Sequence, residues 1–133
     1  MAGSGYSGKP LEEKLGIKPG MRIRLINQPA DYFTLVGQQI AAQVVKSGEA
    51  DLYHLFVISK KVLEKEFAAI IQHCGPKTII WISWYKQSAG QKTDITENII
   101  RELVLPTGWV DVKVCAVNES WSGLKMVKRL EKS

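Results

Sequence analysis

The sequence predicts a compact, Rossmann-like α/β domain with three layers, in which a mostly parallel sheet ends in an antiparallel strand. Two apolar runs, 52–58 and 78–84, are short and rich in β-branched and aromatic residues. Such runs are typical of strands covered on both faces, which occur mainly in parallel sheets. Segments with helical spacing of apolar residues follow each run, and this alternation of strand and helix also indicates a parallel sheet.

The composition is that of an ordinary soluble globular domain, with 45% hydrophobic and 23% charged residues. No apolar run approaches the roughly 20 residues that a membrane-spanning helix needs. The amino terminus lacks the features of a secretory signal and the two cysteines cannot form a disulfide framework, so we expect a cytoplasmic protein. The net charge of +5 is modest, and we interpret it as a solubility feature.

Residues 1–9 are small and polar, and we expect them to form a flexible tail before a single domain at 10–133. The tail contains Gly3, Gly5 and Gly8 at the spacing of a dinucleotide-binding loop. That loop works only where a strand precedes it and a helix follows, so that backbone amides meet the phosphate. Because no strand can precede residue 3, we do not interpret this motif as a cofactor site.

In the first part of the domain, a short helix is predicted at Pro10–Leu15, with Gly16 as its end, and a strand at Met21–Ile26. Asp31 is positioned to cap a second short helix that runs to Val36. The segment 38–46 fits either a helix or a short edge strand, and we favour the strand.

The remaining elements follow from capping residues and apolar spacing. Ser59 is expected to cap a helix that runs to His73. Asp94 and Glu97 have the spacing of a capping box and predict the start of another helix. The strands expected here are Leu52–Ile58, Thr78–Trp84, Val110–Val117 and Trp121–Leu130. The last two form an antiparallel hairpin, and we expect basic residues such as Lys125 to guard a sheet edge.

Polar and aromatic residues follow each predicted parallel strand, at the edge where such sheets bind ligands. The candidate ligand-binding residues are Asn27, Gln28, Ser59, Lys60, Trp84, Tyr85, Lys86 and Thr93. Amides, a helix amino terminus, aromatic rings and lysines together favour a planar or anionic ligand. The same side chains also suit helix caps and loops, so that alternative stays open.

The loop 86–92 is basic, contains Gly90 and has no apolar anchor. We expect it to be a mobile flap over the strand exits, or alternatively a solvent-exposed connector. Closure of such a flap would bring Lys86 and Lys92 over the site, which favours an anionic ligand.

No pattern in the sequence predicts a catalytic residue or a metal site. His54 lies within a buried strand and is interpreted as a hydrogen-bonded core residue. His73 and Cys74 are neighbours, but no further ligands follow at metal-site spacing. Trp81 and Trp84 are three residues apart on one strand and therefore point to opposite faces. We expect Trp81 in the core and Trp84 beside a ligand or a lid.

Several motifs carry a resemblance to known proteins, namely Gly5–Leu11, Leu15–Met21, Thr93–Glu97, Val110–Val117 and Trp121–Lys125. They resemble a bacterial family of small single-domain proteins of unknown function, over nearly the whole chain. The order of elements is also similar to the latter half of a class I methyltransferase. That likeness implies a glycine-rich turn after the first strand and an acidic residue after the next. This chain has Asn27-Gln28-Pro29 at the first place and, at best, Glu49 at the second.

These observations favour a non-enzymatic binding or interaction module, with an anion-binding crevice at the carboxyl ends of the strands. Its partner would be a small anionic ligand or a protein, and no cofactor is predicted. One alternative is a reduced, methyltransferase-like transferase. A second is a weak nucleic-acid binder, which the sequence does not favour because it has neither a recognisable motif nor an aromatic stacking platform.

Overall fold

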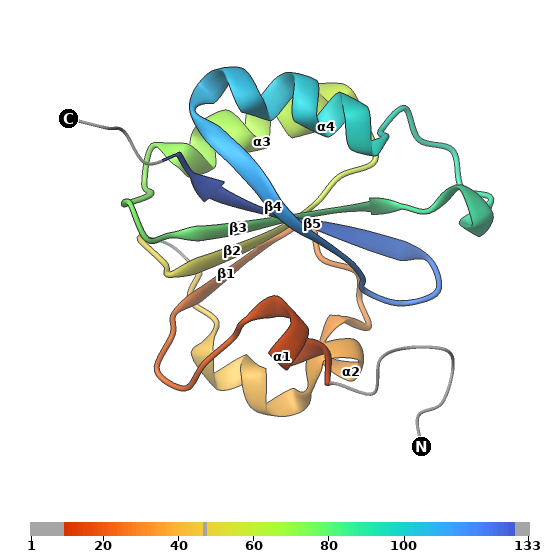
Figure 1. Cartoon of the computed structure of the whole chain (residues 1–133). Coiled ribbons are helices and arrows are strands. Elements are labelled where there is room, and N and C mark those ends of the chain that lie inside the picture. The colour runs from red at the N-terminus through yellow and green to blue at the C-terminus, as the bar shows by residue number, and fades with distance from the viewer. Residues whose placement is uncertain (1–9, 47, 130–133) are drawn as a thin grey trace.

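The computed structural model describes residues 10–46 and 48–129. Within these ranges a five-stranded sheet lies between two layers of helices (Figure 1). The strands are β1 (Ile23–Ile26), β2 (Leu52–Phe56), β3 (Ile79–Tyr85), β4 (Trp109–Ala116) and β5 (Trp121–Lys128). The expected tail at 1–9 lies outside the described residues.

Helices cover both faces of the sheet, as predicted. The helices α3 (Lys60–Ile71) and α4 (Glu97–Val104) lie above it in Figure 1, and we call that side the upper face. The shorter helices α1 (Leu11–Leu15) and α2 (Tyr32–Val36) lie below it, on the lower face. Three 3-10 segments lie at Gln38–Gln43, Gln87–Ala89 and Leu105–Thr107.

The sheet topology confirms the predicted fold class. The strands β1, β2 and β3 pair in parallel, whereas β5 runs antiparallel to both β3 and β4. The prediction that Lys125 guards a sheet edge is wrong, because the order β1-β2-β3-β5-β4 places β5 inside the sheet. Gly123 leaves room for the Trp81 ring to pack against β5, since a Cβ at this residue would lie 3.2 Å from that ring.

The segment 38–46 differs from the predicted edge strand. Residues Gln38–Gln43 form a 3-10 helix, and only Val44 bridges to β1, through Ile23. The Val45 N–H donates to the Ile23 carbonyl at 2.8 Å. Only Ile40 is buried in the 3-10 helix, so the segment lacks the apolar alternation that a full strand needs. The sheet therefore nearly ends at β1, where a classical doubly wound sheet continues with two more strands.

The buried side chains form two hydrophobic clusters, one on each face of the sheet. The upper cluster includes Tyr53, Leu55, Leu63, Phe67, Ile70, Ile80, Ile82, Trp84, Ile100, Val104, Trp109, Leu124 and Met126. The lower cluster includes Leu15, Ile23, Tyr32, Val36, Ile40, Leu52, Phe56, Trp81, Val117 and Trp121. Trp81 and Trp84 thus lie on opposite faces, as their spacing predicted.

Polar groups are buried in the lower layer, where hydrogen bonds join three elements. The Tyr32 hydroxyl lies 3.0 Å from His54 Nδ1, and His54 Nε2 lies 2.7 Å from Ser83 Oγ. All three side chains are fully buried. Burial lowers the pKa of His54 to about 3, so the imidazole is neutral near pH 7. The interpretation of His54 as a hydrogen-bonded core residue is confirmed.

The start of α4 also differs from the prediction. Thr96, rather than Asp94, caps α4, and its Oγ1 accepts a hydrogen bond from the Ile99 N–H at 3.2 Å. The Asp94 carboxylate instead accepts the Lys60 N–H at the start of α3, at 2.7 Å. Both Asp94 and Thr96 are good cap residues, and local sequence alone does not say which helix each one caps.

Candidate functional site

The exit of β1 has a geometry unlike that of a nucleotide-binding turn. Asn27 follows the strand with a φ of 59°, a left-handed conformation that asparagine tolerates better than most residues. Asn27 and Gln28 are both exposed, and Pro29 then leads to α2, which has only five residues. No glycine stands between Met21 and Val36 to let the backbone approach a phosphate.

Side chains of the protein already accept hydrogen bonds from two backbone N–H groups at the amino terminus of α3. Ser59 Oγ accepts the Val62 N–H at 3.2 Å, and Asp94 accepts the Lys60 N–H. Thr93 Oγ1 donates to the Ile58 carbonyl at 2.8 Å and so fixes the end of the 86–92 loop. Two of the amides that could bind an anion therefore already donate to the protein, and an incoming anion would have to displace Asp94.

The residues at and just after the end of β3 also take part in local structure. Trp84 is buried in the upper cluster, with 7% of its surface exposed. The Tyr85 ring stacks on Trp121 with the ring centres 4.1 Å apart. The Lys86 N–H donates to the Ser120 carbonyl at 2.8 Å, so both ends of the 86–92 loop are hydrogen-bonded. Whether this loop moves as a flap stays a prediction.

Gln28 alone among the eight candidate residues lines a pocket of about 410 Å³ along the outer edge of β1. We call it the β1-edge pocket. Its lining residues are Arg24, Leu25, Gln28, Phe33, Ala41, Val44, Val45 and Lys46. The pocket is mostly apolar, with two cations and one amide, and its volume falls within the usual range for small-ligand sites. It lies where the sheet lacks a further full strand.

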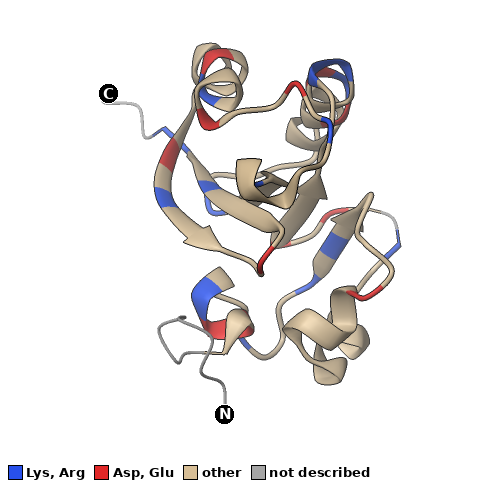
Figure 2. Cartoon of the chain, turned by 90° about the vertical axis from the view of Figure 1, so that its right-hand side faces the viewer, with Lys and Arg blue, Asp and Glu red and all other residues tan. Residues whose placement is uncertain are grey.

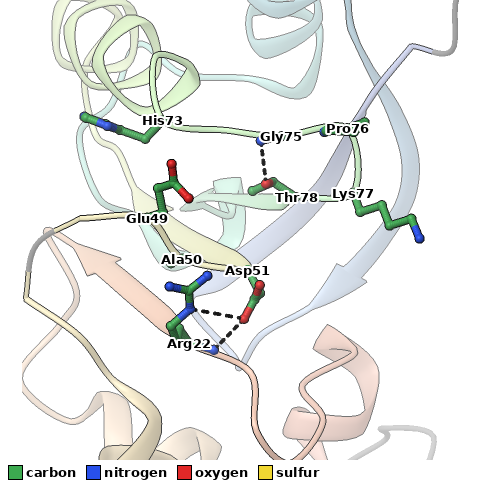
Figure 3. A pocket seen from close by; sticks show the side chains of 9 residues that line it. All are labelled: Arg22, Glu49, Ala50, Asp51, His73, Gly75, Pro76, Lys77 and Thr78. Carbon is green, nitrogen blue, oxygen red and sulfur yellow. Dashed lines mark hydrogen bonds and ion pairs between the residues drawn. The ribbon is translucent and has the colours of Figure 1, made fainter.

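A second pocket, of about 270 Å³, lies at the opposite end of the sheet, before the strands begin (Figure 3). The Arg22 side chain forms an ion pair with Asp51 at 3.7 Å, and Glu49 points from the loop before β2 toward the loop that carries His73. Lys77 extends away from this group. Charges of both signs line this pocket, and the one ion pair is largely exposed, so its contribution to binding energy is small.

Sequence reasoning missed the β1-edge pocket because its two cations are far apart in the chain. Arg24 belongs to β1, and Lys46 follows the single bridge of Val44 to Ile23. The only sequence signal for that bridge was the β-branched pair Val44-Val45 before Lys46. Such a signal is too weak to place Lys46 beside β1.

Other kinds of site find little support in the described residues. No group of His, Cys, Asp or Glu within 10–46 and 48–129 is arranged to hold a metal ion. No helix in those ranges has the length and apolar character to cross a bilayer. Burial raises the pKa of Cys74 to about 11, so this thiol is a poor nucleophile near pH 7. Figure 2 shows Lys and Arg interspersed with Asp and Glu around the fold, rather than a continuous basic stripe.

Comparison with known proteins identifies the fold but not a family. No protein-family model and no curated protein sequence matches the chain. Among solved structures, it is similar to a ribosomal protein L11 methylase from Lactobacillus delbrueckii subsp. bulgaricus, with a TM-score of 0.57 and 10% identity. That match covers 90% of this chain and 76% of the methylase.

Two further structures agree with this match. A SAM-dependent methyltransferase from Aquifex aeolicus has a TM-score of 0.57 and 14% identity, with 86% of each chain covered. A protein of the NADB-Rossmann superfamily from Streptococcus agalactiae has a TM-score of 0.57 and 10% identity, over 94% of this chain and 70% of that one. At such identities the likeness concerns the fold alone: a Rossmann-like fold of the methyltransferase type.

Proposed function

We propose that this protein is a small-ligand-binding module built on a methyltransferase-type Rossmann scaffold, and that it does not use a methyl donor. The observation that carries this proposal is the exit of β1. Asn27-Gln28-Pro29 and the five-residue α2 stand where a donor-binding protein has a glycine-rich turn and a longer helix. Without that turn, backbone amides cannot surround an anionic or dipolar cofactor as they do in nucleotide-binding folds.

The ligand of such a module would bind at the carboxyl ends of the parallel strands. The exposed residues available there are Asn27, Gln28 and Lys60, with Tyr85, Lys86 and Thr93 at the margin. Ser59 and Trp84 support these residues from the upper layer, Ser59 through the cap of α3 and Trp84 through the packing of β3. Gln28 connects this edge to the β1-edge pocket, which gives the module a concave surface.

A reduced methyltransferase is the second candidate, and the fold similarity to two methyltransferases favours it. A thermal-shift screen of the purified chain separates the two candidates. The panel contains S-adenosylmethionine, S-adenosylhomocysteine, nucleotides and small organic anions. A rise in Tm with an organic anion, and none with the adenosyl compounds, is the expected result. A dose-dependent rise with S-adenosylmethionine at micromolar concentration would instead support the methyltransferase.

A further inference from the structure

We infer that the β1-edge pocket binds an organic anion with a flat apolar body, such as an aromatic carboxylate, sulfonate or phosphate ester. This inference rests on the proposed function and gives it a ligand class. The pocket exists because the sheet has only a one-residue bridge beyond β1, at Val44. Beyond this bridge no further strand pairs with β1 in the described residues, and side chains line the space along its outer edge.

The charges around the pocket favour a negative group. Arg24 and Lys46 both line it, and none of the described residues that line it is acidic. The pocket at the opposite end of the sheet differs in this respect, because Glu49 and Asp51 oppose its cations. Two cations with no acidic residue in the described lining raise the local concentration of anions and lower the cost of removing an anion from water.

Two contacts limit the movement of the Arg24 side chain, which lines the pocket. Its guanidinium lies 5.9 Å from the centre of the Tyr53 ring, and its Nη1 donates to the Gly48 carbonyl at 3.3 Å. A guanidinium has five N–H donors, and that bond uses one of them. A planar fork of this kind suits carboxylate, sulfonate and phosphate oxygens better than a lysine does.

The apolar part of the lining fits the rest of such a ligand. Phe33 from α2 and Leu25 from β1 line the pocket together with Ala41, Val44 and Val45. The ring of Phe33 is half-buried and meets the buried Tyr32 ring edge to face, with centres 5.5 Å apart. This contact favours one position of the Phe33 ring, which forms part of the apolar wall of the pocket. Gln28 at the end of the pocket can bond a second polar atom.

Two fluorescent probes test this inference on the full-length protein. The anionic probe 8-anilinonaphthalene-1-sulfonate and the neutral probe N-phenyl-1-naphthylamine share their ring system but differ in the sulfonate. We expect the sulfonate to bind one saturable site on the native protein and the neutral probe to bind more weakly. Added salt should weaken the binding of the sulfonate only.

Variants then locate the site. Arg24→Gln and Lys46→Gln should each weaken sulfonate binding by about five-fold, as for a partly exposed ion pair of about 1 kcal/mol. The matched control is Lys65→Gln, which removes an exposed lysine of α3 outside the pocket. It should leave the affinity for the sulfonate nearly unchanged, because it alters only the net charge of the protein. Circular dichroism checks that each variant is folded. If Arg24→Gln does not fold, Lys46→Gln carries the test, because Lys46 is exposed.

Three results would overturn the inference: equal binding of the two probes, a loss in Lys65→Gln equal to that in Lys46→Gln, or no saturable binding of the sulfonate. None of them decides whether the protein uses a methyl donor, and that part of the proposed function fails instead if S-adenosylmethionine raises Tm. The two ideas can therefore fail separately.

Discussion

The upper and lower layers of this domain are built in different ways. The upper cluster is mostly apolar, with the buried Tyr53 hydroxyl as an exception, and lies beneath two helices, α3 and α4, whose apolar stripes can be seen in the sequence. The lower cluster lies above two five-residue helices and contains buried polar groups, including His54 and Ser83. The side-chain hydrogen bonds that link elements below the sheet are buried. Above the sheet the elements meet through apolar packing, and their side-chain bonds, such as Arg101 to Asp111, are part-buried or exposed.

Specific bonds compensate for the short helices of the lower layer. Trp81 Nε1 donates to the Leu15 carbonyl at 2.8 Å, which fixes α1 against β3. Tyr32 fixes α2 against β2 through His54, and Ser83 extends the link to β3. A helix of five residues has little apolar surface to bury, so these directional bonds determine where it docks.

The largest expected effect is in the upper layer. Ile82→Ala should lower the free energy of unfolding by about 2–5 kcal/mol, because Ile82 is fully buried in the upper cluster and its loss leaves a cavity. Chemical denaturation measures the change. A midpoint that stays within error of the unaltered protein would show that β3 is not central to the fold.

A smaller loss is expected from Ser83→Ala in the lower layer. This change removes the partner of His54 Nε2 and leaves a buried polar nitrogen without a hydrogen bond. The cost should be about 1–3 kcal/mol in the free energy of unfolding. Ser122→Ala on β5 is the matched control, because Ser122 is only half-buried and should change stability far less. Equal effects in the two variants would mean that the buried link contributes no special stability.

The pH dependence of stability should also separate the two layers. The folded-state pKa of His54, about 3, lies below the usual value of about 6.5, so only the unfolded chain binds a proton between these values. Stability from this group is therefore complete above about pH 6.5 and falls as pH drops toward 3. At pH 5.5 the loss should be about 1.4 kcal/mol.

Denaturation between pH 7 and pH 5.5 measures this slope before most carboxylates titrate. His54→Gln should remove the slope, whereas His73→Gln, at an exposed position, should keep it. A slope that persists in His54→Gln would assign it to some other group.

The smallest effect concerns the hydrogen bond between Asp94 and the Lys60 N–H at the start of α3. Asp94→Ala should cost about 1 kcal/mol, because it removes the acceptor of the Lys60 N–H. Thr96→Ala, which removes the cap of α4, should cost a similar amount. The two variants compare a cap supplied from 34 residues away in the chain with a cap supplied by the neighbouring residue. Hydrogen exchange should then show faster exchange at the start of α3 in Asp94→Ala only. Faster exchange at α4 in that variant would restore the predicted capping box.

The sequence predicted the five strands of the sheet and the helices of the upper layer because those depend on local periodicity, although the strand expected at 38–46 is a 3-10 helix. Ser59 and the stripe of α3 are examples, since each needs only a few neighbouring residues to be recognised. The lower layer depends on pairs that are distant in the chain, such as Tyr32 with His54 and Leu15 with Trp81. Asp94 with Lys60 is another such distant pair, and so are Arg24 and Lys46, which line the same pocket. No local pattern specifies such pairs, so of the eight candidate residues only Gln28 lines the β1-edge pocket, and ligand binding at the strand exits stays a prediction.

The measurement that tests the central claim most directly is isothermal titration calorimetry with S-adenosylmethionine. The claim is that the β1 exit, with Asn27-Gln28-Pro29 and no glycine, cannot hold a methyl donor. The expected result is no saturable heat at protein and ligand concentrations that would detect a Kd of about 100 μM, roughly −5.5 kcal/mol of binding free energy. A micromolar Kd with one site per chain would contradict the claim and identify the protein as a functional member of the methyltransferase fold.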